Sequence, residues 1–477
     1  MKTCIKIVLV TLLLSSCKQA PATAQKSINS DPSIASERIE NYLQKLEENG
    51  FSGSVLVAKD GKIIHREGYG YANRKKNQKV TPNTVFDIGS ITKQFTGAAI
   101  LKLEMQGKLK VTDRLSKYFE NVPKDKKEIS LHQLLTHSAG FPPAIGDDYE
   151  AISSEEFVDR AFARPLLFEP GSSYTYSNVG YSILGIIIEQ VAEMTYEEYL
   201  SNNLWIPAGM KSTGYLLPEL TNVAVGYQGD KTWGKPNTKN WSKEGPYWHL
   251  KANGGVLSTI GDMYQWDQAL LGSSILSNEV KRKYYGKHVE EGEGAGSYYG
   301  YGWAIFPTPR DTELIAHNGG NGIFFADMWR YLTEDITIIY MTNAAERRFE
   351  HVASEIAHIL LKPDYTPELK ENQKLEGKQV DALLAEFMQT ITSDDKTVWE
   401  KFINTKLTTT LRQGFTLEEH LEMFARLHRD LGKGKMVEVR IKENAVVILG
   451  VKKNDDSIQL LEFTLTEAMK VDGLRML

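Results

Sequence analysis

The feature that most constrains the fold and the chemistry of this chain is a serine and a lysine three residues apart. Ser90-x-x-Lys93 lies within residues 86–97, a stretch typical of a loop that leads into a helix. Side chains three residues apart on a helix share one face. The serine would lie beside the free N–H groups of the helix N-terminus, and the lysine amine could accept its proton. Such a pair is common by chance, so its meaning depends on the rest of the chain.

A second segment, Tyr176-Ser177-Asn178, opens the next candidate helix. It follows a turn at 170–171 and precedes the mostly apolar run 180–191, which is typical of a buried helix. On its own, the segment is more simply interpreted as an ordinary helix start capped by Ser177 or Asn178. Its place after the first pair is what links it to catalysis.

A third segment, His317-Asn318-Gly319-Gly320, follows the apolar run 314–316 and is expected on or beside a strand. The alternative is a hairpin turn with a histidine at its edge. Three such segments in this order are much less expected by chance than any one of them. Together they match a signature in which Ser-x-x-Lys is followed by a Ser-x-Asn-type and a Lys-Thr-Gly-type segment.

On these residues the chain resembles the serine β-lactamase and penicillin-binding-protein superfamily. The resemblance is to its class C, D-alanyl-D-alanine carboxypeptidase and esterase branch, where the second segment is Tyr-x-Asn and the third is often His-x-Gly. Further matches lie at residues 134–140, 207–213 and 253–263, and the resemblance covers roughly residues 35–365. It implies an α/β (α+β) fold with a mixed, mainly antiparallel sheet flanked by helices, plus a helical subdomain.

The resemblance also implies a mechanism through an acyl-enzyme. Ser90 would attack a carbonyl, and Lys93, with a pKa lowered in a partly dry pocket, would make its deprotonation easier. Tyr176 would be the partner base or the proton shuttle to the leaving group, and Asn178 would orient Lys93 and the acyl side chain. The N–H groups of Ser90 and Gly320 would form the oxyanion hole. No cofactor is implied.

The third segment departs from the β-lactamases of this branch, which usually carry Lys-Thr-Gly where this chain has His317-Asn318-Gly319. The lysine and the hydroxyl group help to hold a substrate carboxylate, whereas histidine is neutral much of the time near pH 7. We therefore predict a serine hydrolase acting on an ester, amide or peptide bond of D-amino-acid type. A class C-like β-lactamase or D,D-carboxypeptidase is the alternative. The expected substrate-binding residues are Asn178, His317, Asn318, Gly319 and Gly320.

Other classes of function are less consistent with the sequence. A net charge of −5 argues against a nucleic-acid partner. No serine lies in Gly-x-Ser-x-Gly and no His-Glu-x-x-His occurs, so neither an α/β-hydrolase nor a metal site is expected. His65 and His137 are interpreted as structural, with the helix that carries His137 ending at Gly140. A non-catalytic lipoprotein that binds cell-wall fragments stays open, although a pure binder does not need a desolvated lysine.

The first residues have the pattern of a targeting segment. Lys2 and Lys6 flank the start of an apolar run, 7–14, that is too short to span a bilayer. The sequence LSSC at 14–17 then matches the bacterial lipobox, where a signal peptidase cuts before a cysteine that becomes lipidated. Residues 1–17 are therefore predicted to be a lipoprotein signal, with Cys17 bearing the lipid. A plain secretory signal or an uncleaved anchor is the alternative.

Two cysteines occur, Cys4 and Cys17, and Cys4 would leave with the signal, so the mature chain could form no internal disulfide. Residues 18–34 are small and polar, as expected for a flexible tether. We predict an exported protein, lipid-anchored in the bacterial cell envelope on the periplasmic side or at the cell surface. Its expected partners are the membrane and a small-molecule or peptide substrate, for which the cell wall is one source.

At 477 residues the chain is too long for one ordinary domain. Residues 35–362 are predicted to form the hydrolase domain. It would begin with a helix over 35–48 and a hairpin over 54–65, whose Asp60-Gly61 turn suits type I′. A buried strand over 335–341 and a helix over 348–361 would close it, so that the two ends of the domain pair in one sheet.

Residues 363–376 are predicted to be a linker, because they combine prolines with a charged, polar run. Residues 377–477 are predicted to form a small α+β accessory domain. Thr416 and Glu419 make a capping box that opens a helix. Strands are expected over 437–441, 445–451 and 458–465, and no catalytic constellation is expected in this domain.

Overall fold

The computed structural model describes residues 32–292, 294–346, 349–362, 364–367, 377–413, 416–441, 446–453, 457–466 and 468–476. The predicted signal, Cys17 and the tether up to residue 31 lie outside the described residues, as does most of the predicted linker. Helix α1 (Pro32–Glu48) begins three residues before the expected start, so the last residues of the predicted tether are helical. The domain boundaries themselves stay a prediction.

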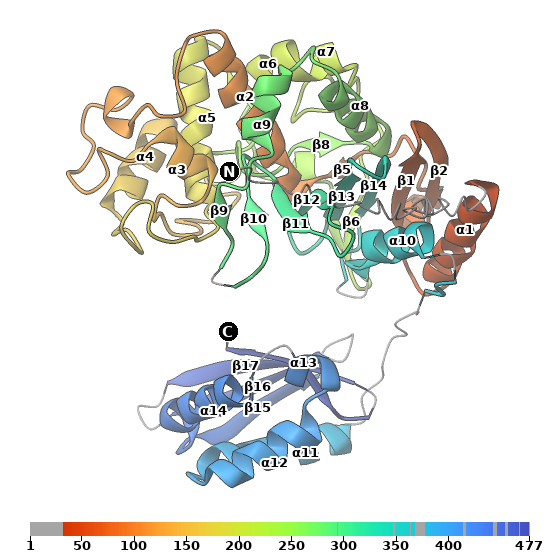
Figure 1. The fold of residues 1–477 in the computed structure, drawn as a ribbon, viewed down its shortest axis with the longest axis vertical. Helices are drawn as coiled ribbons and strands as arrows, with labels where there is room; N and C mark the ends of the chain where they lie inside the picture. Colours follow the sequence, from red (N-terminus) through yellow and green to blue (C-terminus); the bar gives the residue numbers. More distant parts are fainter. Residues whose placement is uncertain are drawn as a thin grey trace, which may run out of the picture.

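An antiparallel sheet of eight strands forms the centre of the N-terminal region, in the order β2-β1-β14-β13-β12-β11-β10-β9 (Figure 1). Its strands are β1 (Gly53–Lys59), β2 (Lys62–Tyr69), β9 (Val289–Glu290), β10 (Tyr298–Tyr299), β11 (Ala304–Pro307), β12 (Glu313–Gly320), β13 (Phe325–Tyr331) and β14 (Ile336–Thr342). The predicted hairpin is confirmed: Asp60 and Gly61 both have positive φ, 53° and 71°, as a type I′ turn requires. Strand β1 pairs with β14, with Gly53 opposite Thr342, so both ends of the region meet in one sheet.

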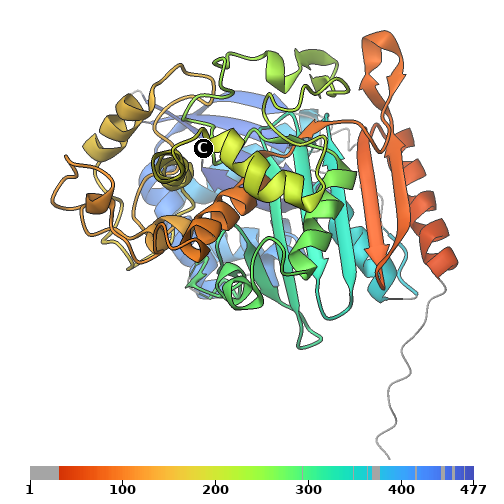
Figure 2. The same cartoon turned by 90° about the horizontal axis from the view of Figure 1, so that it is seen from above.

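Side chains of the central strands alternate between two hydrophobic clusters, one on each face of the sheet. On β14, Ile338 and Tyr340 belong to one cluster with α1 and α10 (Val352–Leu361). Ile339 and Met341 belong to the other, with α2 (Thr92–Met105) and α8 (Ile260–Leu271). Figure 2 shows α1 and α10 on one side of the sheet. This period of two is what buries β14 on both faces.

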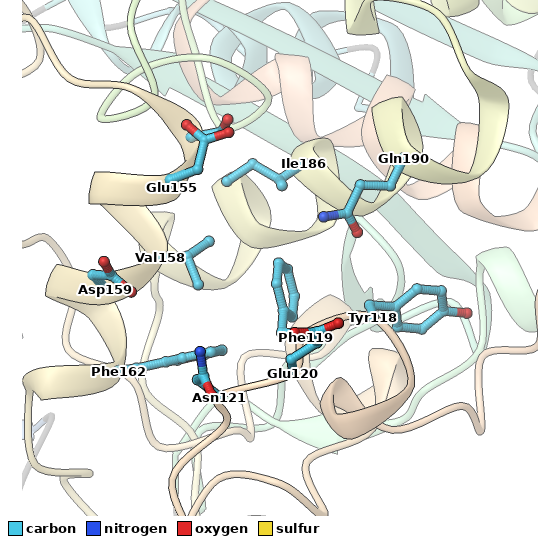
Figure 3. A pocket seen from close by; sticks show the side chains of 11 residues that line it. Tyr118, Phe119, Glu120, Asn121, Glu155, Val158, Asp159, Phe162, Ile186 and Gln190 are labelled. Atoms are coloured by element: carbon cyan, nitrogen blue, oxygen red, sulfur yellow. The ribbon is translucent and has the colours of Figure 1, made fainter.

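Helices α3 (Leu131–Leu135), α4 (Ser154–Ala163) and α5 (Asn178–Ala192) form a helical region beside α2, as the resemblance implied. A hollow of about 240 Å³ opens between α4, α5 and residues 118–121 (Figure 3). It has no lining residue in common with the cavity at Ser90. The remaining elements are α6 (Tyr196–Leu200), α7 (Ile206–Ala208), α9 (Asn278–Tyr284), β3 (Tyr71–Asn73), β4 (Gln78–Lys79), β5 (Phe86–Asp87), β6 (Gly226–Gln228), β7 (Lys231–Gly234) and β8 (Leu257–Ser258).

Within its described residues, the C-terminal region consists of four helices followed by an antiparallel meander. The elements are α11 (Gly377–Thr392), α12 (Lys396–Lys406), α13 (Thr409–Gln413), α14 (Leu417–Leu431), β15 (Lys435–Ile441), β16 (Val446–Lys452), β17 (Ile458–Leu465) and β18 (Val471–Met476). The Thr416–Glu419 capping box that opens α14 is confirmed. Strand β18 was not expected, since Asp472 and Gly473 interrupt its apolar pattern. Within the described parts of the chain, no helix is long and apolar enough to cross a membrane.

Candidate active site

Ser90 lies in a tight 3₁₀ turn, Gly89–Ile91, from which α2 continues. Gly89 has φ 50°, and its N–H group donates to the Asp87 carboxylate at 2.7 Å. A Cβ atom on Gly89 would lie 2.5 Å from the backbone nitrogen of Gly320. The turn that carries the serine is therefore packed directly against the end of strand β12.

Lys93 follows one turn later, and its side chain is completely buried. Its Nζ atom lies 3.1 Å from Ser90 Oγ, 2.8 Å from Asn178 Oδ1 and 2.8 Å from the backbone oxygen of Asn253. Burial lowers the pKa of Lys93 well below its ordinary value.

In its deprotonated form, the Lys93 amine has two N–H groups and one lone pair. The oxygens of Asn178 and Asn253 can only accept hydrogen bonds, so they take the two N–H groups. The third contact of Nζ is with Ser90 Oγ, to which the protonated amine donates. Once the amine is deprotonated, its lone pair can accept the Ser90 hydroxyl proton. Asn253 lies in the matched stretch 253–263, but sequence reasoning gave it no role, because its contribution is a backbone carbonyl.

The Tyr176 hydroxyl is buried and has no hydrogen-bond partner within the described part of the chain. The Lys93 amine lies 4.6 Å from the centre of its ring. Burial raises the pKa of Tyr176 above its ordinary value, and the nearby Ser90 hydroxyl acts in the opposite direction. The phenol is therefore neutral, and of the two expected roles this favours proton shuttle over resident base.

His317 is buried on β12 and touches two partners. Its Nδ1 lies 2.6 Å from the carbonyl oxygen of Asn318, which can only accept, so Nδ1 carries a proton. Its Nε2 then accepts from the Tyr299 hydroxyl at 2.9 Å. Burial, with Lys93 nearby, lowers the pKa of His317 to about 3. The third segment therefore supplies no cation.

The other residues of the third segment differ in their surroundings: one faces solvent, and the glycines lie against the turn that carries Ser90 (the serine turn). Asn318 is exposed, whereas Gly319 is buried against Ser90. A Cβ atom on Gly319 would lie 2.1 Å from the Ile88 oxygen and 2.4 Å from the Ser90 nitrogen. Gly320 lines one cavity with Ser90, so the structure brings together the two residues expected to form the oxyanion hole.

The expectation that His137 lies on a helix is wrong. Helix α3 ends at Leu135, and His137 follows it with φ 58°, because the chain turns there to reach the second segment. Its Nδ1 accepts from the Ser177 N–H group at 3.0 Å, and its ring lies 4.3 Å from that of Tyr176. This contact makes it a support for the second segment, in agreement with a structural role.

The cavity at Ser90 is small, about 40 Å³. Its lining residues are Asp87, Gly89, Ser90, Asp148, Tyr149, Asn178, Leu250, Asn253, Gly254, Gly255, Gly320 and Asn321. Two of these are carboxylates and none is lysine or arginine. Burial raises the pKa of Asp87 to about 6. Over the described ranges, no group of three or more His, Cys, Asp or Glu side chains could hold a metal ion.

The sequence profile of the Beta-lactamase family matches residues 38–361. The chain belongs to this family. The family consists of serine hydrolases, so the predicted superfamily, the predicted fold class and a hydrolase related to β-lactamases and penicillin-binding proteins are confirmed.

Two curated relatives come from Bacillus subtilis (strain 168). "Penicillin-binding protein 4*" is 29% identical over 69% of this chain and 76% of the relative. "Putative penicillin-binding protein PbpX" is 32% identical over 60% of this chain and 69% of the relative.

Two solved structures share the fold. The octameric penicillin-binding protein homologue from Pyrococcus abyssi has a TM-score of 0.59 at 23% identity, over 91% of this chain and 94% of its own. D-amino acid amidase from Ochrobactrum anthropi SV3, complexed with L-phenylalanine, has a TM-score of 0.59 at 23% identity, over 70% of this chain and 100% of its own. At these identities the likeness concerns the fold alone.

Proposed function

We propose that this protein hydrolyses an ester, amide or peptide bond of D-amino-acid type through an acyl-enzyme on Ser90. One observation carries the proposal: the completely buried Lys93 amine lies 3.1 Å from Ser90 Oγ and is held there by the oxygens of Asn178 and Asn253. A hydroxyl group at a helix start beside a neutral amine is an activated nucleophile.

In the first half-reaction, Ser90 Oγ attacks the carbonyl carbon as its proton moves to Lys93. The N–H groups of Ser90 and Gly320 bind the oxygen that becomes negative. The proton then passes through the Tyr176 hydroxyl to the leaving nitrogen or oxygen, the carbon–heteroatom bond breaks, and the acyl-enzyme remains. Water repeats the sequence in reverse, which releases the acid and restores the Ser90 hydroxyl.

The charges of the cavity favour this function over that of a β-lactamase or D,D-carboxypeptidase. Penicillins and peptide C-termini carry a carboxylate that a cation must hold. In this chain His317 is neutral, and the cavity lining contains Asp87 and Asp148 but no lysine or arginine. A further carboxylate brought by the substrate would be repelled there.

We further propose that the protein is exported and held at the bacterial envelope by a lipid on Cys17, on the periplasmic side or at the cell surface. The support is the signal-like pattern of residues 1–17. Envelope fragments that contain D-amino acids would then be natural substrates. Metabolic labelling with a palmitate analogue should mark the wild-type chain and spare Cys17→Ser; equal labelling of both would contradict the anchor.

Treatment of the protein with an activated fluorophosphonate tests the hydrolase. Mass spectrometry should find the adduct on Ser90, and Ser90→Ala should lose both the adduct and the hydrolysis of a p-nitrophenyl ester. Ser172→Ala is the control, since Ser172 is exposed on a turn and its hydroxyl donates to the Glu169 carbonyl. An unlabelled Ser90, or an adduct on another serine, would refute the mechanism and favour a non-catalytic binding protein.

A further inference from the structure

Asp148 lines the catalytic cavity together with Ser90, Asn178 and Gly320. It comes from the irregular segment between α3 and α4, and sequence reasoning gave it no role. Burial and the neighbouring Asp147 raise the pKa of Asp148, and the charge of Lys93 acts in the opposite direction. Asp148 therefore belongs to the cavity that contains the candidate nucleophile.

The carboxylate of Asp148 forms no hydrogen bond or ion pair with any residue that the structure describes. The other acidic residues nearby are occupied. Asp87 accepts from the Gly89 N–H group and from the Asn321 amide, at 2.7 and 3.0 Å. Asp147 accepts from the Tyr149 N–H group at 2.9 Å. Asp148 is thus the carboxylate of the cavity with its acceptor capacity unused.

The segment that carries Asp148 is fixed on both sides. Glu150 accepts from Arg160 of α4 at 2.5 Å and lies 3.4 Å from His249 Nε2. The carbonyl group of Tyr149 accepts from the Asn240 amide at 2.9 Å. Because its neighbours are held, Asp148 keeps its position without a partner of its own. Such a preorganised charge is what a binding group needs.

No cation within the cavity lining is paired with this carboxylate. The lining contains no lysine or arginine, and the hydrogen bonds of Lys93 Nζ go to Ser90, Asn178 and Asn253. A half-buried carboxylate without a partner is costly, and an incoming ammonium group removes that cost. The matching ligand group carries several N–H donors and a positive charge.

We propose that Asp148 binds a protonated amine of the substrate beside the scissile carbonyl. The inference rests on the proposed hydrolase and narrows its substrates to amino-acid amides, amino-acid esters and peptides with a free amino group near the cleaved bond. The cavity of about 40 Å³ beside Ser90 favours a small group there. Asp148 is then the specificity-determining residue for the acyl side of the substrate.

Two substrates that differ by one acetyl group test the proposal. D-alanine p-nitroanilide keeps its ammonium group, whereas N-acetyl-D-alanine p-nitroanilide has a neutral amide at the same place. Wild-type kcat/KM should favour the free amine. Asp148→Asn should lower kcat/KM for the free amine by about 10- to 100-fold and leave the acetylated substrate within about twofold, since one charge-assisted hydrogen bond is lost.

Asp147→Asn is the matched control. It removes the same charge one residue away, from an exposed side chain that does not line the cavity, and the new amide oxygen can still accept from Tyr149. It should leave the ratio of the two substrates unchanged. Equal losses on both substrates in Asp148→Asn would mean that Asp148 acts through Lys93, and would overturn the inference, as would the same ratio change in Asp147→Asn.

A binding measurement separates this inference from the hydrolase itself. D-alaninamide should slow fluorophosphonate labelling of Ser90 in the wild type much more than in Asp148→Asn, and N-acetyl-D-alaninamide should protect neither. Labelling of Ser90 without protection by D-alaninamide would overturn the inference and leave the hydrolase standing. No labelling of Ser90 at all would overturn both. Matching melting temperatures exclude unfolding of the variant as the cause.

Discussion

Substitution of Gly319 by alanine is the most direct test of the contact between strand β12 and the serine turn. The new Cβ atom would lie 2.1 Å from the Ile88 oxygen and 2.4 Å from the Ser90 nitrogen. Both are backbone atoms, so no side chain can rotate away to relieve the clash. The strand and the turn must instead move apart by roughly 1 Å to reach ordinary contact.

A displacement of this size acts on the reacting centre. Gly320 is the next residue, so its N–H group moves relative to that of Ser90, and the expected oxyanion hole widens. Loss of one such donor, or a misplacement of about 1 Å, lowers the rate by about 10²- to 10³-fold. Overpacking should also lower the free energy of unfolding by about 1–3 kcal/mol.

Hydrolysis of a p-nitrophenyl ester measures the rate, and urea denaturation followed by circular dichroism measures the stability. The loss should appear in kcat more than in KM, because the oxyanion forms only in the transition state. Gly272→Ala is the control, since its Cβ atom would meet only the Ala269 oxygen, at 3.7 Å. If Gly319→Ala keeps a kcat within about threefold of wild type, the contact does not position the oxyanion donors.

Three side chains of the site give further testable outcomes. Tyr176→Phe should change the free energy of unfolding by less than about 1 kcal/mol, because the hydroxyl has no partner among the described residues, and should lower kcat/KM by about 10²- to 10⁴-fold. Urea denaturation measures the stability and ester hydrolysis the rate, and preserved activity would exclude the shuttle role. Lys93→Arg should abolish ester hydrolysis, because a guanidinium group stays protonated and cannot accept the Ser90 proton, and a variant with a tenth of wild-type activity would contradict this. The pKa of His317 is about 3 in the folded chain and 6.5 in the reference state, so the unfolded chain binds more protons within that window and stability falls as the pH is lowered through it. His317→Gln should flatten this pH dependence in urea denaturation, and an unchanged slope would show that other groups cause it.

Local patterns predicted those parts of the fold and of the site that lie within one helix or one turn. The spacing of Ser90 and Lys93 follows from the helix period, and the Asp60-Gly61 turn and the Thr416 capping box follow from local backbone chemistry. These features need no information from distant residues, so the sequence sufficed for them.

The residues whose place in the site was not predicted from the sequence are positioned by contacts between distant segments. Asp148 has no periodic pattern around it, and the ion pair of Glu150 with Arg160 joins its segment to α4. His137 lies beyond the end of α3, and its ring accepts from the N–H group of Ser177, some forty residues away in sequence. In both cases tertiary packing decided the conformation.

The pairing of β1 with β14 has a consequence for how the N-terminal region folds. Gly53 and Thr342 are neighbours in the sheet, yet nearly the whole region separates them along the chain. The chain must lose the conformational entropy of this long loop before the pairing stabilises it, and this makes folding of such a topology slow. The turn that carries Ser90 also gains its packing only when β12 is in place, because the end of β12 packs against it. A nascent chain that ends before β12 therefore has the Ser90–Lys93 pair but not the complete site, so catalytic competence should arise late, in the same step that closes the sheet.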